Sequence, residues 1–218
     1  VYQSVIQRER NLEYGGKCVE VVPHVPLEVI NRIKKAAELA KADFTIIEIG
    51  GTVGGYHNIL FLEAARMMRT ETPDDVIVIL VSYFPIPAKV GEMKTKPTQT
   101  AVRTLNSAGI FPDFILCRAE VPLDDVRKEK LATFCNIPKG NAISAPDVEN
   151  IYEIPLNFEK EQLGTKILDK FGLKNKGQDL KEWANLVETI KFVKKKVNIG
   201  IVGKYFATGH FTLSLIHI

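Results

Sequence analysis

A run of six apolar residues with no polar face, Val76 to Val81 (VIVILV), constrains the fold of this chain more than any other feature. A strand that is apolar on both sides must be covered on both sides, as in a parallel sheet between layers of helices. Further strands are expected at 18–22 (CVEVV), 44–49 (FTIIEI), 114–116 and 142–144. The sequence therefore predicts an α/β fold.

Helices are expected between these strands. In the segment 27–42, apolar residues recur at spacings of three and four, and Pro26 stands where a first helical turn tolerates proline. The segment 59–68 has a similar apolar stripe. A helix at 183–196 is expected to end in the three lysines Lys194 to Lys196, which suit a helix C-terminus. This alternation favours a parallel sheet flanked by helices.

Composition excludes several classes of protein. Hydrophobic residues make up 45% and charged residues 25% of the 218 residues, which argues against disorder and coiled coil. The net charge of +3 is too small to indicate a nucleic-acid partner, and no apolar run is long enough for a membrane helix. Three cysteines without a CxxC pair fit a reducing cytoplasm better than a disulfide framework or a structural zinc site, and their apolar surroundings predict buried, unreactive thiols.

The domain organisation is expected to change near residue 172. A polar stretch at 174–181 (KNKGQDLK) has the composition of a linker. We expect a main domain at 1–172, a linker and helix at 173–196, and the start of a second domain at 197–218, opening with a strand at 197–202. Because the chain begins with Val and its last residues are atypical, we expect it to be an internal piece of a longer protein.

Two segments could carry chemistry. Glu48 lies near the end of an expected strand and is followed by four glycines within seven residues, a composition that lets backbone approach a phosphate. Lys94 and Lys96 flank Thr95 and precede Pro97, with Thr98 and Gln99 beyond, a set that could cradle a triphosphate. The structural alternative for Glu48 is an ion pair beside a simple glycine turn. The structural alternative for the segment from Lys94 to Gln99 is a solvated polar loop. Considered alone, residues 127–130 indicate a charged, solvated helix face. Considered alone, His24 indicates a structural histidine.

Together these segments resemble CTP synthase. The resemblance runs from Tyr2 to about Tyr205 and is carried by EIGGTVG (48–54), FLEAAR (61–66), GEMKTKPTQ (91–99), GIFPDFILCR (109–118), LATFCN (131–136), DVENIYEIP (147–155) and IGIVGKY (199–205). It implies a P-loop NTPase-like amidoligase domain, here without its first strand and P-loop, and the first strand of a class I glutaminase domain.

The resemblance also implies an activity. Such an enzyme belongs to pyrimidine nucleotide biosynthesis and uses ATP with Mg²⁺ to phosphorylate O4 of UTP. Ammonia released from glutamine then displaces the phosphate and gives CTP. GTP activates the enzyme, CTP inhibits it, and four identical subunits assemble. Because GxxxxGK[ST] occurs nowhere in this chain, we expect the 218 residues alone to be inactive.

The resemblance assigns roles to individual residues. It implies that Glu48 is a magnesium ligand and that His24 lies near a GTP-responsive interface. The UTP and CTP contacts would be Lys94, Thr95, Lys96, Pro97, Thr98, Gln99 and Lys130, with Lys94 and Lys96 also catalytic. The ATP contacts would be Pro146, Asp147 and Val148.

One departure concerns inhibition by CTP. Members of the family typically carry two carboxylates where this chain has Gly55 and His57, on either side of Tyr56. The CTP-inhibition segment 55–57 therefore lacks its acidic pair. This departure motivates an alternative, a non-catalytic nucleotide-binding homologue that acts as an assembly or regulatory subunit. Another ATP-dependent ligase of the same architecture is less favoured, because KTKPTQ would then have no role.

Overall fold

The computed structural model describes residues 1–177, 179–193, 197, 198 and 200. The chain divides into two compact units, residues 1–179 and 180–218.

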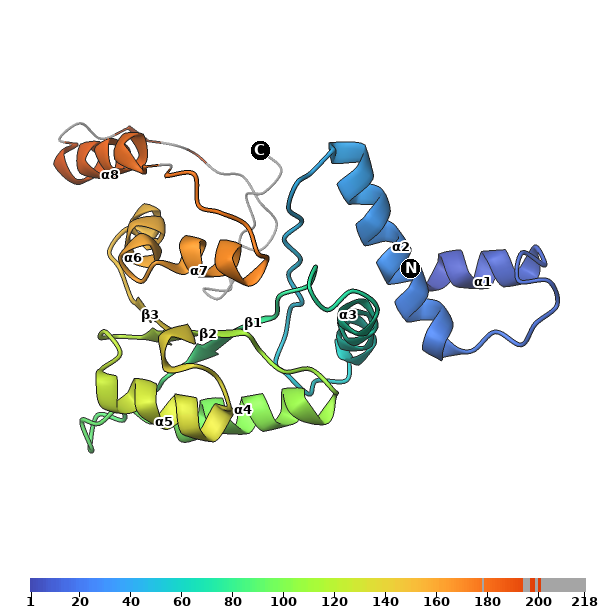
Figure 1. Ribbon diagram of the computed structural model, residues 1–218, viewed down its shortest axis with the longest axis horizontal. Helices are drawn as coiled ribbons and strands as arrows, with labels where there is room; N and C mark the ends of the chain where they lie inside the picture. Colours follow the sequence, from blue (N-terminus) through green and yellow to red (C-terminus); the bar gives the residue numbers. More distant parts are fainter. Residues whose placement is uncertain (178, 194–196, 199, 201–218) are drawn as a thin grey trace. The chain divides into compact units, whose positions relative to one another are not determined.

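Three parallel strands form the centre of the first unit (Figure 1). They are β1 (Ile79–Tyr83), β2 (Phe114–Ala119) and β3 (Ala142–Pro146), with β2 in the middle. Leu80 of β1 is the partner of Ile115, and Cys117 is the partner of Ser144 in β3. The expected parallel α/β sheet is confirmed.

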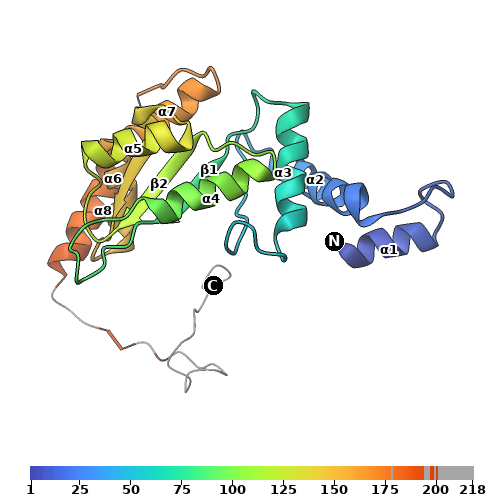
Figure 2. The ribbon, with the colours of Figure 1, turned by 90° about the horizontal axis from the view of Figure 1, so that it is seen from below.

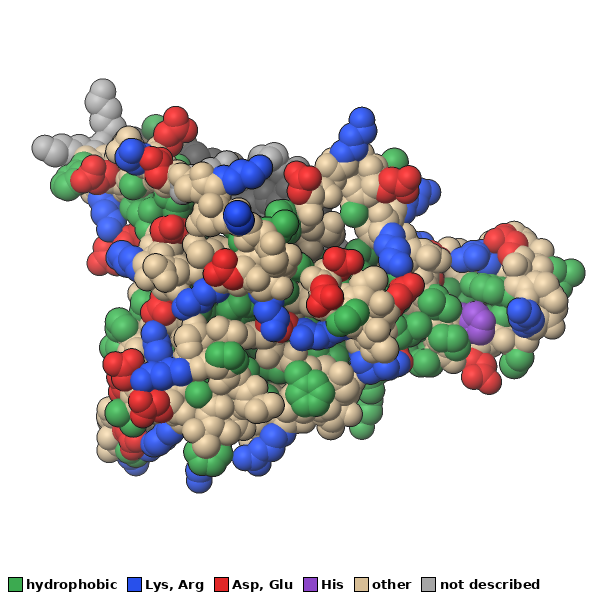
Figure 3. All heavy atoms as spheres, in the orientation of Figure 1, with side chains coloured by type: hydrophobic (Ala, Val, Ile, Leu, Met, Phe, Trp, Pro, Cys, Tyr) green, Lys and Arg blue, Asp and Glu red, His purple; other side chains and the backbone are tan. Residues whose placement is uncertain are grey.

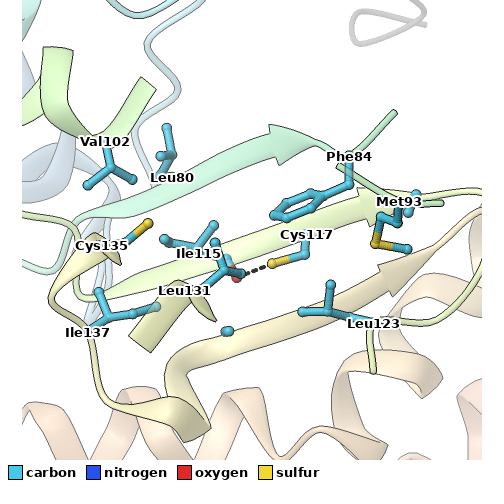
Figure 4. Packing of buried hydrophobic residues seen from close by; sticks show 12 residues of the cluster. Leu80, Phe84, Met93, Val102, Ile115, Cys117, Leu123, Leu131, Cys135 and Ile137 are labelled. Atoms are coloured by element: carbon cyan, nitrogen blue, oxygen red, sulfur yellow. Dashed lines mark hydrogen bonds between the residues drawn. The ribbon is translucent and has the colours of Figure 1, made fainter. Parts of the chain in front are cut away.

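Helices cover both faces of this sheet (Figures 1 and 2). The helices α4 (Lys96–Ser107) and α5 (Asp125–Cys135) pack on one face, and α6 (Ile154–Lys160) and α7 (Leu163–Lys170) pack on the other. Side chains alternate along β2, so that Ile115 and Cys117 join the core with α4 and α5 (Figure 4), whereas Phe114 and Leu116 join the core with α6 and α7. A central strand with two covered faces explains the apolar character of its sequence.

Three helices precede the sheet in sequence. They are α1 (Tyr2–Arg10), α2 (Val21–Ala40) and α3 (Ile59–Glu71). The helices α2 and α3 share a small apolar cluster that includes Ile30 and Ala64. Leu62 of α3 packs with Leu105 of α4, which joins these helices to the sheet. Two short 3₁₀ helices, Lys139–Asn141 and Ile151–Glu153, flank β3, and α8 (Lys181–Phe192) belongs to the second unit.

Two expected strands are wrong. Residues 18–20 have no regular structure, and α2 begins at Val21 with a break at Val22, whose φ of −112° and ψ of 126° are not helical. Because the regular helix continues only after this break, Pro26 lies near its start, where proline is tolerated. Residues 44–49 pair with no other strand in the described part of the chain, and Ile46 is 97% exposed. An isolated extended segment lacks the ladder of hydrogen bonds that defines a strand, however suitable its side chains are.

The bounds of β1 and α8 differ from the expected ones. The sheet pairing of β1 starts at Ile79 and not at Val76, and the amide of Val78 donates to the Asp113 carboxylate at 2.8 Å. Helix α8 begins at Lys181 and ends at Phe192. The three lysines at 194–196 lie outside the described residues, and so do residues 199, 201 and 202 of the expected strand at 197–202, the glutaminase strand of the resemblance.

The surface carries both signs of charge. Basic and acidic side chains are intermixed on the face drawn in Figure 3, in keeping with the small net charge. Among the described residues, no helix has the length and apolar composition needed to cross a membrane.

Candidate functional site

Two pockets lie beside the carboxyl ends of the parallel strands, where ligands bind in open α/β sheets. The first, here called the lysine pocket, has a volume of about 530 Å³ and is lined by Pro85, Glu92, Met93, Lys94, Thr95, Lys96, Pro97, Arg127 and Lys130. The second, the Asp147 pocket, has a volume of about 430 Å³ and includes Pro146, Asp147 and Val148.

Backbone hydrogen bonds build the lysine pocket. Directly after β1, the amide of Phe84 donates to the Arg118 carbonyl at 2.7 Å. The chain then returns, and the amide of Lys94 donates to the Pro85 carbonyl at 2.9 Å. Helix α4 starts two residues later, with Pro97 in its first turn, where proline is tolerated. The segment Glu92 to Thr95 is therefore held beside the end of the sheet.

The first two turns of α5 form another wall of the lysine pocket. Asp124 caps this helix, because its side chain accepts a hydrogen bond from the Arg127 amide at 2.8 Å. Arg127 and Lys130 are three residues apart and therefore lie on the same side of α5. Both line the lysine pocket.

Positive charge prevails in the lysine pocket. Four basic side chains line it, against the single carboxylate of Glu92. Lys94 Nζ lies 2.8 Å from Glu92 Oε2. The hydrogen bond from Lys94 lowers the pKa of Glu92, and the charges of Arg127 and Lys130 add to the effect. An excess of cations around a concave site suits a polyphosphate, whose oxygens accept charge-assisted hydrogen bonds.

Not all residues of the KTKPTQ segment face this pocket. Lys94, Thr95, Lys96 and Pro97 line it, as does Lys130. Thr98 is fully buried, and its hydroxyl is hydrogen-bonded to that of Ser82 in β1 at 2.8 Å. Gln99 Nε2 donates to Thr95 Oγ1 at 3.1 Å. The hydrogen bond of Thr98 holds α4 against β1, and the hydrogen bond of Gln99 holds the first turn of α4 together.

The Asp147 pocket lies on the other side of the sheet, against α6. Its remaining lining residues are Val81, Leu116, Arg118, Ala145, Ile151, Ile154, Asn157 and Phe158. Arg118 Nη2 lies 3.2 Å from Asp147 Oδ1, and the Asp147 amide donates to the Ala119 carbonyl at 2.8 Å. Apolar walls with a few polar groups at the mouth suit a planar heterocycle.

Glu48 lines neither pocket. Its side chain belongs to an exposed stretch, and the described residues hold no group of three carboxylate, histidine or cysteine side chains arranged to bind a metal. Mg²⁺ at nucleotide sites is commonly bound by one or two carboxylates, with phosphates and water completing its shell. A single accessible carboxylate after an extended segment fits that kind of site and does not fit an all-protein cage.

Residues 55–57 form a turn before α3. Tyr56 is 97% exposed, and the ring of His57 lies against the backbone of Gly51. Asn58 is buried and donates to the carbonyls of Gly50 and Thr52, and its own Oδ1 has no partner among the residues that the structure describes. His57 therefore helps to shape the glycine turn, and none of residues 55–57 lines either pocket.

Comparison with known proteins identifies the family. The family described as CTP synthase N-terminus matches residues 1–173. The chain belongs to the CTP synthase family. A CTP synthase from Chlamydia muridarum is 47% identical over 207 residues, and one from Methanothermobacter thermautotrophicus is 42% identical over 207 residues. Each of these alignments covers 94% of this chain but only 39% of the relative. A CTP synthase from Picosynechococcus is 42% identical over 99% of this chain and 39% of its own length.

His24 and the three cysteines line neither pocket. His24 Nδ1 accepts a hydrogen bond from the Glu20 amide at 3.0 Å, and the ring packs edge-on against Tyr14. Cys117 and Cys135 are buried as expected, and burial raises the pKa of Cys117 to about 12 and that of Cys135 to about 11. The expectation for Cys18 is wrong, because it is exposed in the loop before α2.

Sequence reasoning missed two charged lining residues of the lysine pocket, Glu92 and Arg127, and two apolar ones, Pro85 and Met93. Residues 127–130 resembled a solvated helix face, yet Arg127 is only 19% exposed. The spacing of three residues between Arg127 and Lys130 could have predicted this position for Arg127. It places Arg127 on the same side of the helix as Lys130, which the resemblance assigns to the nucleotide.

Proposed function

We propose that this chain carries the UTP site and the adenine site of an ATP- and glutamine-dependent ligase that makes CTP. The observation that carries the proposal is the convergence of Lys94, Lys96 and Lys130 on one pocket at the end of the sheet. Membership of the CTP synthase family supports the choice of nucleotide. The chain spans about two fifths of the length of the relatives compared here (39%), so the complete reaction is proposed for a longer protein.

In this proposal the lysine pocket binds the triphosphate of UTP and orients its ring. Lys94 and Lys96 also balance charge as the γ-phosphoryl group of ATP passes to O4 of UTP, a step that depends mainly on positioning and electrostatics. Ammonia then attacks C4, inorganic phosphate leaves with the C4–O4 electron pair, and CTP results. Pro146, Asp147 and Val148 hold the adenine of ATP. Glu48 would be one ligand of a nucleotide-bound Mg²⁺, which neutralises phosphate charge.

Other features of the family are proposed for the longer protein. They comprise glutamine as the ammonia source, activation by GTP, a homotetramer and a cytoplasmic location. Inhibition by CTP through residues 55–57 is expected to be weak, because glycine and histidine stand where carboxylates would accept hydrogen bonds from the sugar or base. Thr98 and Gln99 are proposed to act on UTP through the position of α4, because their side chains are bonded internally.

A titration with UTP tests the nucleotide site. Lys130→Met is expected to weaken UTP binding about tenfold, the loss of one charge-assisted hydrogen bond to phosphate. The matched control is Lys139→Met, because Lys139 is exposed, pairs with Glu129 at 2.7 Å and lines neither pocket. Equal affinities in the wild type and Lys130→Met would contradict the proposed site.

The substitution of the acidic pair by Gly55 and His57 favours a second candidate, a non-catalytic nucleotide-binding subunit. A chimera separates the two. Residues 1–173, which match the family, would replace the corresponding segment of the Chlamydia muridarum relative, and CTP formation would be followed with UTP, ATP, Mg²⁺ and glutamine. Turnover supports the ligase. A folded chimera that binds UTP without making CTP supports the subunit role, and CTP formation by the 218 residues alone with ammonia would contradict their expected inactivity.

A further inference from the structure

Arg127 differs from the other cations of the lysine pocket in its burial. The side chain of Arg127 is 19% exposed, compared with 38% for Lys94, and Lys96 and Lys130 are exposed residues. An arginine that is largely removed from water must have partners for its N–H groups. Those partners show what the residue does.

The guanidinium of Arg127 joins two separate segments. Its Nε donates to the backbone carbonyl of Met93 at 3.2 Å, and Nη1 donates to the Asp124 carboxylate that caps α5. Its Nη2 lies 3.7 Å from Glu92 Oε1. Met93 is itself buried in the core between the sheet and α5, so the carbonyl that Arg127 binds lies at a fixed point of the fold.

We propose that Arg127 is a positioning residue that clamps the segment 92–94 to the first turn of α5. Lys94 follows the clamped carbonyl directly, and Lys130 lies one helical turn after Arg127. The clamp therefore sets the separation of the two lysines across the pocket. The role in UTP binding rests on the proposed function, whereas the clamp itself rests on the contacts of Arg127.

The shape of arginine matters for this role. A planar guanidinium presents Nε and two terminal nitrogens in fixed directions, so that one side chain can bind a carbonyl and a carboxylate together. A lysine at this position would keep the charge but would offer a single ammonium, which cannot reproduce both directions. Because Nε and Nη1 are already committed to Met93 and Asp124, Arg127 acts through the segment it holds.

Hydrogen exchange of the Lys94 amide reports directly on the clamp, because this amide donates to the Pro85 carbonyl at 2.9 Å. Arg127→Met is expected to speed its exchange about tenfold, the loss of roughly one charge-assisted hydrogen bond, and to weaken UTP binding by a similar factor. Arg127→Lys should fall between this variant and the wild type. The matched control is Arg103→Met, because Arg103 is exposed on α4 and lines neither pocket.

The outcomes separate the clamp from the nucleotide. Faster exchange at Lys94 in Arg127→Met, with an unchanged melting temperature and no effect of Arg103→Met, supports the clamp. Unchanged exchange at Lys94 overturns it, and if UTP binding nevertheless weakens, Arg127 is a direct ligand. Should Arg127→Met fail to fold, the comparison of Arg127→Lys with the wild type decides. If the wild type binds no UTP, the proposed nucleotide fails for this chain, and the exchange rates still decide the clamp.

Discussion

Gly51 lies in a backbone conformation that other residues rarely adopt, with φ at +87°. A Cβ atom there would also lie 1.9 Å from His57 Nε2, well inside contact distance. Gly16 has a similar φ of +71° but open space around it. A comparison of alanine substitutions at these two glycines therefore distinguishes the cost of backbone strain from the cost of steric conflict.

We predict that Gly51→Ala lowers the free energy of unfolding more than Gly16→Ala does. Strain at a positive φ costs about 1–2 kcal/mol in both variants, and the displacement of the His57 ring adds to it only at Gly51. Denaturant unfolding measures the difference. The double variant Gly51→Ala with His57→Ala should recover the steric part alone, and equal losses for the two glycines would contradict this account.

Asp113 is a buried carboxylate that links α3 and α7 to the residue just before β1. It accepts hydrogen bonds from Arg69 of α3 and from the amide of Val78, and Lys170 Nζ of α7 lies 3.1 Å from Oδ1. Burial alone raises the pKa of Asp113, but the hydrogen bonds from Arg69, Val78 and Lys170 outweigh it and hold the pKa below its ordinary value. The ionised form is therefore more stable in the folded protein than in the unfolded chain.

We predict that Asp113→Asn destabilises the protein by about 3 kcal/mol at neutral pH, the cost of breaking a buried ion pair. A lowered pKa contributes stability above the unfolded value of about 4, and this contribution is lost as the pH falls through the folded value. The stabilities of wild type and variant should therefore converge in acid. Unfolding measured from pH 7 to pH 3 tests this; a constant difference across that range would exclude the linkage.

At the scale of elements, the segment 44–49 exposes several apolar side chains, Phe44, Ile46 and Ile47 among them. Ile46 is 97% exposed, and this segment pairs with no strand in the described part of the chain. Extended apolar segments with free backbone groups associate with one another. We predict that Ile46→Lys reduces self-association in light scattering without changing the melting temperature. Leu80→Lys, at a buried β1 position, should instead unfold the protein. Unchanged scattering by Ile46→Lys would show that this segment does not drive association.

The sequence predicted elements whose signal is local. The strands β2 and β3 and the helix α3 coincide with apolar runs or stripes that a short window contains. The segment 44–49 has the same local signal but forms no strand, because pairing depends on a neighbour elsewhere in the chain. In the same way, KTKPTQ predicted the lysine pocket, whereas the bond from Arg127 to Met93 spans 34 residues and could not be read from either segment.

At the scale of the whole molecule, the chain separates at Asp179. The strands β1, β2 and β3 and both pockets lie in the first unit, and α8 lies in the second. We predict that a chain ending at Asp179 melts within a few degrees of the full chain, because the apolar clusters of the first unit are made of residues before Asp179. Calorimetry of the two chains tests this, and loss of the cooperative transition in the shorter chain would mean that the second unit completes the core.

Hydrogen exchange with bound nucleotides tests the central claim. This claim is that the lysine pocket binds UTP and that the Asp147 pocket, on the other side of the sheet, binds the adenine of ATP. UTP is expected to protect residues 92–97 and 127–130, and ATP is expected to protect residues 146–151, each without protecting the other set. Protection of the Asp147 pocket by UTP, or no protection of the lysine pocket by UTP at saturating concentration, would contradict the account.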